Sequence, residues 1–337
     1  MRLSVIIPCR NEVRFIRECI EAIYLNDLPF GIELSVIVVD GMSDDGSREL
    51  VQKTAKSHTK LFLIDNLEKL TPYAFNLGLN FLEADYYQIV GARHIISTNY
   101  LRKSIELLET NNLIWCVGGK LINQYTTNTS KIISKAMDTS FGMGLGNFRI
   151  LEKSNFTDTV TSPMYPNWVF EKIGYFDDEL IRNQDDDFNF RVTQAGGKIW
   201  FESEISLKYY VRGNFKGLSK QFFQYGYWKV YVNKKHKNIT TFRQLVPPLF
   251  VVYLLMVPFS FILSFKFGEF FSLGLIFYML LSFMVSFKKS IGIKEFFGIF
   301  KTFPILHFSY GLGYLQGLIH FIILGKKPSD KQKSLSR

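Results

Sequence analysis

Short runs of apolar, often β-branched residues alternate along the first ninety residues with longer segments whose apolar positions recur at helical spacing. The apolar runs are 3–8, 34–39, 61–64 and 86–90, and the helical segments are 11–25, 47–56 and 72–82. Strands that alternate with helices predict an α/β unit with a mainly parallel sheet. Such sheets bind ligands at the carboxyl ends of their strands. We therefore look for functional residues directly after Pro8, Val39 and Val90.

The pattern becomes less regular in the second hundred residues. The further elements that it predicts are a helix at 98–110, a strand at 114–119, a polar, glycine-rich loop at 123–165 and a strand at 198–201. An acidic cluster at 184–187 stands out between them. Aromatic and basic residues are mixed over about 214–235, which predicts an amphipathic helix at a membrane interface. The alternative is a helix packed on the domain. We take 1–235 as one domain.

Charges become rare beyond this domain. Segments 246–265 and 270–287 are apolar and about long enough to span a bilayer, and 303–324 is a third apolar stretch that contains polar residues. Lysines follow the second stretch, and the tail 325–337 is basic. The positive-inside rule puts both basic segments on the cytoplasmic face, which two spans satisfy. We expect 303–324 to be re-entrant or interfacial, with a third span as the alternative. The predicted location is the cell (inner) membrane, with 1–235 on its cytoplasmic face.

Composition limits the classes of partner that the chain is expected to bind. The chain of 337 residues has a formal net charge of +10, and such a balance suits nucleic acid, anionic lipid or phosphorylated small molecules. No zinc-finger or RNA-binding signature is present, so nucleic acid is not expected as a partner. Much of the excess charge lies near the apolar segments, which favours a membrane surface. Three scattered cysteines and the lack of a signal-peptide pattern at the start are typical of a cytosolic domain.

Two segments at predicted strand ends are candidates for chemistry. The strand 34–39 ends at Asp40, and a glycine- and serine-rich turn follows. A carboxylate at this edge can accept hydrogen bonds from ribose hydroxyls or from a base N–H; the alternative is an acidic loop that caps the next helix. The first strand runs into Pro8-Cys9-Arg10-Asn11-Glu12, which a parallel sheet places beside Asp40. Its alternative is an ordinary strand-to-helix turn with Asn11 as the cap.

These segments together resemble the family-2 glycosyltransferases, which have the GT-A nucleotide-diphospho-sugar transferase fold. The resemblance extends over about 1–235. Its further motifs are 69–76 before the central strand, Gly174-Tyr175-Phe176-Asp177-Asp178-Glu179 for G-x-F-D-E, Asn183-Gln184-Asp185 for N-E-D, and the aromatic segment 221–229. The aromatic segment and the C-terminal membrane helices resemble the members that assemble exopolysaccharides of the succinoglycan type.

The resemblance implies roles for individual residues. Asp40 would bind the nucleoside of a nucleotide-diphosphate sugar. Asp185 would be the general base that deprotonates the acceptor hydroxyl, which gives a single displacement with inversion. The alternative for 184–187 is a solvated acidic loop. The other residues implied on the donor side are Pro8, Asn11, Glu12, Asn76 and Arg93, and those on the acceptor side are Asp186, Gln221 and Trp228.

The chain departs from the family at the metal motif. A D-x-D or D-x-H pattern usually ends the central strand and holds Mg²⁺ or Mn²⁺, whereas this chain has Gly91, Ala92 and Arg93, followed by His94. Glycine and arginine side chains do not provide the oxygen ligands that a hard cation needs. In one hypothesis Arg93 supplies the positive charge without a metal, because guanidinium matches phosphate geometry. In the other the activity is lost or changed. Mg²⁺ or Mn²⁺ stays open as a cofactor, with His94 a weak ligand candidate.

The function that we predict is an inverting, non-processive glycosyltransferase. It would move one sugar from a nucleotide-diphosphate sugar to a lipid-linked or other glycan acceptor in polysaccharide or glycoconjugate biosynthesis. Processive synthases carry Q-x-x-R-W in the aromatic helix, whereas this chain has Gln221 followed by Gln224-Tyr225. The alternative is a catalytically inactive nucleotide-sugar-binding or scaffold protein of the same machinery.

Overall fold

Apolar runs separated by helices form the expected parallel strands in the computed structural model, which describes residues 1–144, 148–211 and 213–328. The strands are β1 (Arg2–Cys9), β2 (Glu33–Asp40), β3 (Leu61–Asp65) and β4 (Tyr86–Ile89), in the spatial order β3-β2-β1-β4. The neighbouring side chains Val5 and Ile6 of β1, and Val36 and Ile37 of β2, point to opposite faces and are all fully buried, as apolar runs predict for a sheet covered on both faces. The predicted α/β class is confirmed.

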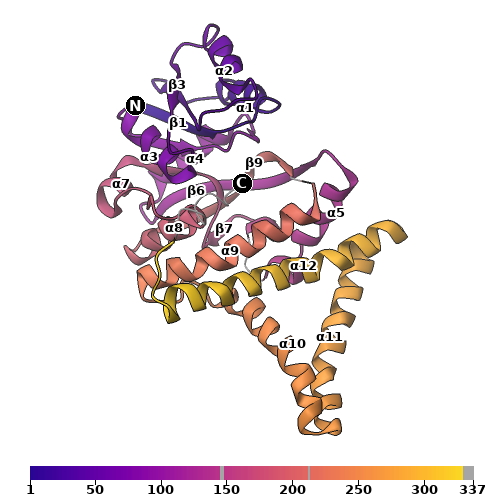
Figure 1. The fold of residues 1–337 in the computed structure, drawn as a ribbon. Coiled ribbons are helices and arrows are strands. Elements are labelled where there is room, and N and C mark those ends of the chain that lie inside the picture. Colours follow the sequence, from indigo (N-terminus) through magenta and orange to yellow (C-terminus); the bar gives the residue numbers. More distant parts are fainter. Residues whose placement is uncertain (145–147, 212, 329–337) are drawn as a thin grey trace. The chain divides into compact units, whose positions relative to one another are not determined.

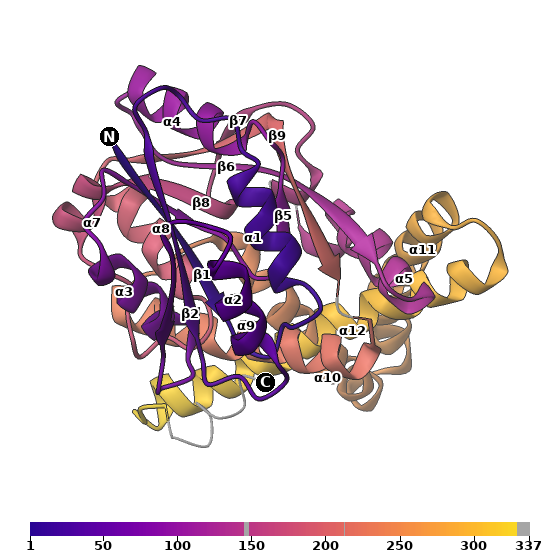
Figure 2. The same cartoon turned by 90° about the horizontal axis from the view of Figure 1, so that it is seen from above.

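The chain divides into two units. The first comprises Met1–Gln124 and Leu151–Tyr210, and the second comprises Tyr125–Ile150 and Val211–Arg337. The helices of the first unit are α1 (Ile16–Tyr24), α2 (Ser47–Ala55), α3 (Thr71–Phe81), α4 (Tyr100–Thr110), α7 (Asn167–Ile173) and α8 (Gln184–Gln194). Helix α3 packs on β1 and β2, whereas α1 packs on β5 (Figures 1 and 2).

Antiparallel strands extend the sheet beyond β4. They are β5 (His94–Ile96), β6 (Ile114–Tyr125), β7 (Asn155–Thr157), β8 (Thr161–Pro166) and β9 (Lys198–Val211). Strand β8 lies between β4 and β6, and β9 pairs with both β5 and β7. These strands bring the chain back across the sheet. Helix α8, which follows β8 and α7 along the chain, therefore lies in the same unit.

The segment 123–165 is not the loop that its composition predicts. It contains α5 (Asn128–Met137), α6 (Ser140–Met143), the 3₁₀ turn η1 (Phe148–Ile150), β7 and β8. Thr127 and Ser130 form a reciprocal capping box at the start of α5, with serine in place of the usual Glu or Gln. Two prolines make β8 hard to predict from the sequence, because proline cannot donate a hydrogen bond to the strand ladder and is rare inside sheets.

Helices make up most of the second unit. Besides α5, α6 and η1, they are α9 (Phe215–His236), η2 (Phe242–Leu245), α10 (Val246–Leu263), α11 (Phe265–Lys289), α12 (Ile293–Gly317) and a π-helical turn, η3 (Leu318–Ile323). Helices α9 and α12 run side by side (Figure 1). A Cβ at Gly226 would lie 2.0 Å from the carbonyl oxygen of Tyr310, so glycine permits this close packing. Glu295 of α12 pairs with Lys131 and Lys135 of α5.

Two helices of this unit have the length and composition to cross a membrane. They are Phe242–Leu263 and Phe265–Lys289, with mean hydropathies of 2.2 and 2.1, and most of their side chains are not buried in the protein. The predicted span 270–287 falls inside the second helix, whereas 246–265 extends two residues beyond the end of the first, at Leu263. The stretch 303–324 lies within α12 and η3, where Phe303 and Phe321 are buried. Its relation to a bilayer stays a prediction, and of the tail 325–337 only the part up to residue 328 is among the described residues.

Candidate functional site

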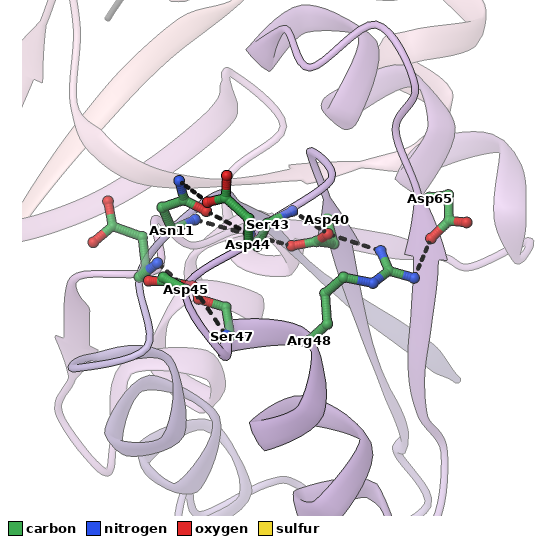
Figure 3. A network of polar contacts seen from close by, with 9 residues as sticks. Asn11, Asp40, Ser43, Asp44, Asp45, Ser47, Arg48 and Asp65 are labelled. Atoms are coloured by element: carbon green, nitrogen blue, oxygen red, sulfur yellow. Dashed lines mark hydrogen bonds and ion pairs between the residues drawn. The ribbon is translucent and has the colours of Figure 1, made fainter.

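The parallel strands bring two carboxylates together at their carboxyl ends. The register pairs Asp40, the last residue of β2, with Asp65, the last residue of β3. Arg48, in the first turn of α2, lies between them: its Nη1 is 2.8 Å from Asp40 Oδ2 and its Nη2 is 2.8 Å from Asp65 Oδ1 (Figure 3). The Asp40 side chain is 1% exposed, whereas that of Asp65 is 51% exposed. One guanidinium therefore joins a buried carboxylate to an accessible one.

Asp40 also fixes the turn that follows β2. Its Oδ2 accepts a hydrogen bond from Ser43 N–H (2.9 Å), and its Oδ1 accepts one from Ser43 Oγ (2.5 Å). Ser43 Oγ in turn accepts the N–H of Asn11 (2.8 Å). The Asn11 side chain exchanges two hydrogen bonds with Asp44, at 2.8 and 3.0 Å (Figure 3). The loops after β1 and β2 are thus bonded into one polar surface.

Asn11 does not cap the following helix. Its φ of 56° is in the left-handed region, which asparagine tolerates better than most residues, and α1 begins at Ile16. The alternative of an ordinary strand-to-helix turn with Asn11 as the cap is therefore wrong. Pro8 lies inside β1 opposite Val39, one residue before the last pair of the ladder, Cys9 and Asp40.

Asp45 joins the same two loops a second time. Its Oδ2 accepts the N–H of Val13 (3.1 Å), and its Oδ1 accepts both N–H and Oγ–H of Ser47, the first residue of α2. Ser47 Oγ accepts the N–H of Glu12 (2.8 Å). Burial opposes the charged form of Asp45, but the hydrogen bonds from Ser47 and Val13 outweigh it and lower the pKa of this carboxyl. The ionised Asp45 carboxylate therefore helps to hold the loops after β1 and β2 together.

The position of the family's metal motif has a different chemistry. Gly91 N–H donates to His94 Nδ1 (3.3 Å), and this nitrogen lies 2.7 Å from Ser162 Oγ. A Cβ at residue 91 would lie 3.0 Å from the His94 ring. An aspartate in place of Gly91 would thus require the His94 ring to shift by a few tenths of an ångström.

Arg93 is held from two sides. Its Nε lies 2.6 Å from Glu12 Oε2, and its guanidinium carbon lies 4.9 Å from the centre of the Phe15 ring. The side chains of Arg93 and Glu12 are 25% and 11% exposed, so the pair is partly withdrawn from water. Charge-assisted hydrogen bonding and the aromatic face both restrict the guanidinium.

The residues at this position do not form a site for Mg²⁺ or Mn²⁺. Gly91 has no side-chain donor, and Arg93 carries the charge that a cation would carry. In the part of the chain that the structure describes, no three His, Cys, Asp or Glu side chains cluster closely enough to hold a metal ion. A hard cation needs several oxygen ligands, and this set of side chains does not supply them.

Asn76 holds a second predicted motif in place. Its Nδ2 donates to the Phe176 carbonyl (2.8 Å) and to Asp178 Oδ1 (2.6 Å), and its Oδ1 accepts the Phe176 N–H (3.1 Å). This α3 side chain thereby fixes the G-x-F-D-E-like stretch one hundred residues later. The stretch leads directly into α8 and its acidic first turn.

Burial separates the three aspartates of that turn. Asp187 is 2% exposed, and its Oδ2 lies 3.0 Å from Arg191 Nη2. Arg191 also donates to two carbonyl groups, those of Ile173 and Tyr175. Asp185 is exposed and Asp186 is intermediate. Asp187 therefore has a structural position, and the two carboxylates named by the resemblance are the accessible ones.

The remaining predicted residues lie in the second unit. Gln221 of α9 donates to the hydroxyl of Tyr225 (2.7 Å). Trp228 is 2% exposed and packs near Tyr231 and Phe321. A ring buried in this way contacts protein, which favours the alternative of a packed helix for Trp228. Acceptor contact by either residue stays a prediction.

Comparisons with known proteins place the sequence of the chain in a family. Residues 4–174, about half of the chain, match the family described as glycosyl transferase family 2. The chain is a family 2 glycosyltransferase. The match includes the surface around Asp40, the predicted motif 69–76 and the turn at Arg93, and it ends at Gly174, before Asp185 and the aromatic segment 221–229.

Named relatives extend over more of this glycosyltransferase. It is 28% identical over 245 residues to the dolichyl N-acetyl-α-D-glucosaminyl phosphate 3-β-D-2,3-diacetamido-2,3-dideoxy-β-D-glucuronosyltransferase of Methanococcus voltae, covering 70% of this chain and 76% of the relative. It is 25% identical over 248 residues to the succinoglycan biosynthesis protein ExoA of Rhizobium meliloti, covering 72% and 73%. The solved structure of S. aureus TarS residues 1–349 with UDP matches with a TM-score of 0.50 at 16% identity. That match covers 69% of this chain and 65%, just under two thirds, of the TarS chain. The likeness to TarS supports the GT-A-like fold alone.

Several residues of this surface were absent from the sequence prediction. They are Ser43, Asp45, Ser47, Arg48 and Asp65. Arg48 had a usable signal, because it lies in the first turn of the predicted helix 47–56, directly after the strand that Asp40 ends. Asp65 ends the next predicted strand and belongs to the same edge for the same reason that Asp40 does.

Proposed function

We propose that this family 2 enzyme moves one sugar from a nucleotide-diphosphate sugar to a lipid-linked or other glycan acceptor, with inversion and without processive elongation. The observation that carries the proposal is the polar surface around Asp40, at the carboxyl edge of the parallel strands within the family match. The names of the M. voltae and R. meliloti relatives, which refer to a dolichyl phosphate-linked sugar and to succinoglycan, support a glycan acceptor and a role in polysaccharide or glycoconjugate biosynthesis.

The nucleoside would bind over the turn that follows Asp40. Because this carboxylate is 1% exposed and already accepts hydrogen bonds from Ser43 and Arg48, its main effect would be to hold the turn in shape. The accessible carboxylate of Asp65 and the Asn11–Asp44 pair border the same turn. A loop fixed before the ligand arrives loses little conformational entropy on binding.

Arg93 would stabilise the charge of the leaving diphosphate. The bond that breaks leaves a nucleoside diphosphate, whose negative charge grows in the transition state, and a guanidinium matches that charge in a fork. Glu12 holds Nε, and the remaining N–H groups of Arg93 make no hydrogen bond with another residue that the structure describes. The proposal therefore assigns Glu12 and Phe15 to positioning Arg93, with no step through a metal.

Asp185 would act as the general base. As the acceptor hydroxyl oxygen attacks the anomeric carbon, its proton passes to the Asp185 carboxylate and the bond to the diphosphate oxygen breaks on the opposite face. This single displacement inverts the anomeric configuration. Asp185 is exposed at the start of α8, and Asp186 beside it would contact the acceptor.

The acceptor would be presented by a membrane. Helices Phe242–Leu263 and Phe265–Lys289 have the length and hydropathy to span a bilayer. The lysines that follow the second helix favour a cytoplasmic position for that end under the positive-inside rule, together with the catalytic unit. An enzyme held there meets lipid-linked acceptors on the cytoplasmic face of the cell membrane.

The test is donor hydrolysis and sugar transfer by the purified full chain. UDP- and GDP-sugars are supplied with a membrane lipid extract, in Mg²⁺ or Mn²⁺ and in EDTA. Asp185→Asn and Arg93→Ala are compared with Asp187→Asn, which carries the same charge change as the first variant at the buried position. We expect turnover that survives EDTA and falls by about 10²–10³-fold in Arg93→Ala, as for loss of one transition-state donor.

Other outcomes would contradict parts of the proposal. Turnover that EDTA abolishes would mean that a metal, and not Arg93, balances the diphosphate. Equal activity of Asp185→Asn and the unaltered protein would remove Asp185 as the base. UDP binding with no turnover for any donor would favour the inactive nucleotide-sugar-binding protein.

A further inference from the structure

The second unit contains a cavity of about 640 Å³ where α9 ends. Its apolar lining includes Val230, Leu245, Leu318 and Ile322, and its polar lining includes Lys234 and Lys237. The volume is within the range of small-molecule sites. We propose that this cavity binds an anionic phospholipid of the surrounding bilayer, with the phosphate at the two lysines and the start of one acyl chain over the apolar lining.

Charge complementarity favours an anionic occupant. No Asp or Glu occurs between residues 205 and 268, whereas this stretch contains ten Lys and Arg residues. Neither Lys234 nor Lys237 forms an ion pair with another residue that the structure describes. Two ammonium groups with no carboxylate along this part of the chain attract a phosphate, and lysine binds phosphate as a compact point charge.

The position of the cavity along the chain favours a lipid over a free anion. Leu245, which lines it, lies in the first turn of the apolar helix Phe242–Leu263. A helix of this length spans the hydrocarbon layer, so its ends lie at the level of the headgroups. Ile322, on another wall of the cavity, belongs to the η3 turn. Ile319 and Ile323 of the same turn are 50% and 73% exposed. A lipid bound at the level of the headgroups would therefore have the lysines next to its phosphate and apolar protein surface next to its acyl chain.

The wall of the cavity is formed before any ligand binds. Asn233 Nδ2 donates to Gln244 Oε1 (2.9 Å) and to the hydroxyl of Tyr314 (3.1 Å), and Asn233 Oδ1 accepts the N–H of Thr240 (3.2 Å). These bonds join α9, η2 and α12 around the two lysines. Preorganisation of this kind distinguishes a lipid site from a diffuse basic surface.

The inference rests on the membrane placement proposed above, but not on the transfer reaction. Native mass spectrometry of the full chain in detergent counts bound lipid directly, with phosphatidylglycerol compared with phosphatidylcholine. The double variant Lys234→Gln/Lys237→Gln removes the phosphate contacts, and Ile322→Trp fills the cavity without changing charge. The matched control is Lys288→Gln/Lys289→Gln, the same charge change at the end of α11 and outside the cavity.

We expect one phosphatidylglycerol to bind more tightly than phosphatidylcholine. The Lys234/Lys237 double variant should lower its apparent affinity about 30-fold, at about 1 kcal/mol for each lysine near an anionic headgroup. Ile322→Trp should also lower it, and the control pair should not. Equal losses in both lysine pairs, or equal binding of the two lipids, would overturn the site.

Two other results would assign the cavity to a different occupant. Full displacement of the lipid by millimolar inorganic phosphate would make it a free-anion site. A polyprenyl phosphate recovered with the protein, and lost in the Lys234/Lys237 variant together with an increased KM for the acceptor, would make it the acceptor site. Because lipid is counted without turnover, a chain that transfers no sugar can still pass this test, and an active enzyme can fail it.

Discussion

Replacing Asp40 with asparagine removes the charge from a carboxylate that accepts three hydrogen bonds. Ser43 N–H and Arg48 Nη1 both point at Oδ2, and Ser43 Oγ points at Oδ1. An asparagine amide has only one oxygen, so its NH₂ group must face at least one donor. The side chain is 1% exposed, and water cannot replace the lost acceptor. We expect a loss of about 2–4 kcal/mol in the free energy of unfolding, because hydrogen bonds to charged groups contribute about 1.5–3 kcal/mol and breaking buried pairs costs more.

Asp65→Asn is the matched control. It removes a carboxylate charge from the same guanidinium at the same distance, 2.8 Å, but from a side chain that is 51% exposed. Exposed ion pairs contribute about 0.2–1 kcal/mol, because water screens them. The two carboxylates differ in burial and in their partners, because Asp40 also accepts two hydrogen bonds from Ser43. We expect the loss of stability in Asp40→Asn to be at least twice that in Asp65→Asn.

Thermal unfolding of the full chain in detergent gives the global comparison, at about 2–4 °C per kcal/mol. Hydrogen exchange of the amides in 41–48 gives the local one. It should accelerate strongly in Asp40→Asn and little in Asp65→Asn. UDP affinity should follow the exchange rate, since the proposal has Asp40 act through the turn. Equal effects of the two variants on stability and exchange would refute the reasoning from burial. Unchanged exchange with lost UDP binding would mean that Asp40 contacts the nucleotide directly.

Three further changes test other parts of the structure. Asn76→Ala removes three hydrogen bonds to 176–178 and should cost about 1–3 kcal/mol, with faster hydrogen exchange confined to that stretch and α8. Gly226→Ala places a methyl group against the carbonyl of Tyr310 and should lower Tm by several degrees, while the exposed Leu312→Ala does not. Hydrogen bonds from Lys135, Ile291 N–H and Lys131 lower the pKa of Glu295 to about 2, from 4.5. Its stabilisation is therefore complete above pH 4.5 and is lost as the pH falls toward 2. Glu295→Gln should be less stable than the unaltered chain at pH 6, and thermal scans should show the difference shrinking between pH 4.5 and 2; a constant difference would contradict this ion pair.

The parallel half of the sheet could be predicted because its signal is local. Runs such as 34–39 are continuous and apolar, which is what burial on both faces requires. The antiparallel half could be predicted only in part: the predicted strands 114–119 and 198–201 fall in β6 and β9, whereas β5, β7 and β8 were not predicted. Strand β8 carries two prolines and pairs with β4 and β6, whereas β5 has only three residues and pairs with β9. These long-range pairings, and not a local pattern, decide the structure of the two strands.

The candidate site shows the same limit. Asp40 could be placed from its position at a strand end, but its burial and its three hydrogen bonds depend on the loop geometry. Asp187 and Asp185 are two residues apart in one acidic run, and nothing in the run itself distinguishes them. Arg191, one helical turn after Asp187, pairs with it, and this contact is visible only in the folded chain.

The proposed role of Arg93 would explain how a family 2 site can differ at its metal motif and still fit a diphosphate. A metal ion brings its own charge and is held by several oxygens, whereas an arginine needs only to be oriented. Glu12 and Phe15 restrict its guanidinium, and both come from the loop after β1 that also carries Asn11. The substitution at the end of β4 is thus matched by contacts from the neighbouring strand. If Glu12 positions Arg93, Glu12→Gln should preserve the size of the side chain at residue 12 but weaken its hydrogen bond to Arg93. The kcat should then fall, while KM for the donor changes little. A stability loss with unchanged kcat would make Glu12 a structural partner only.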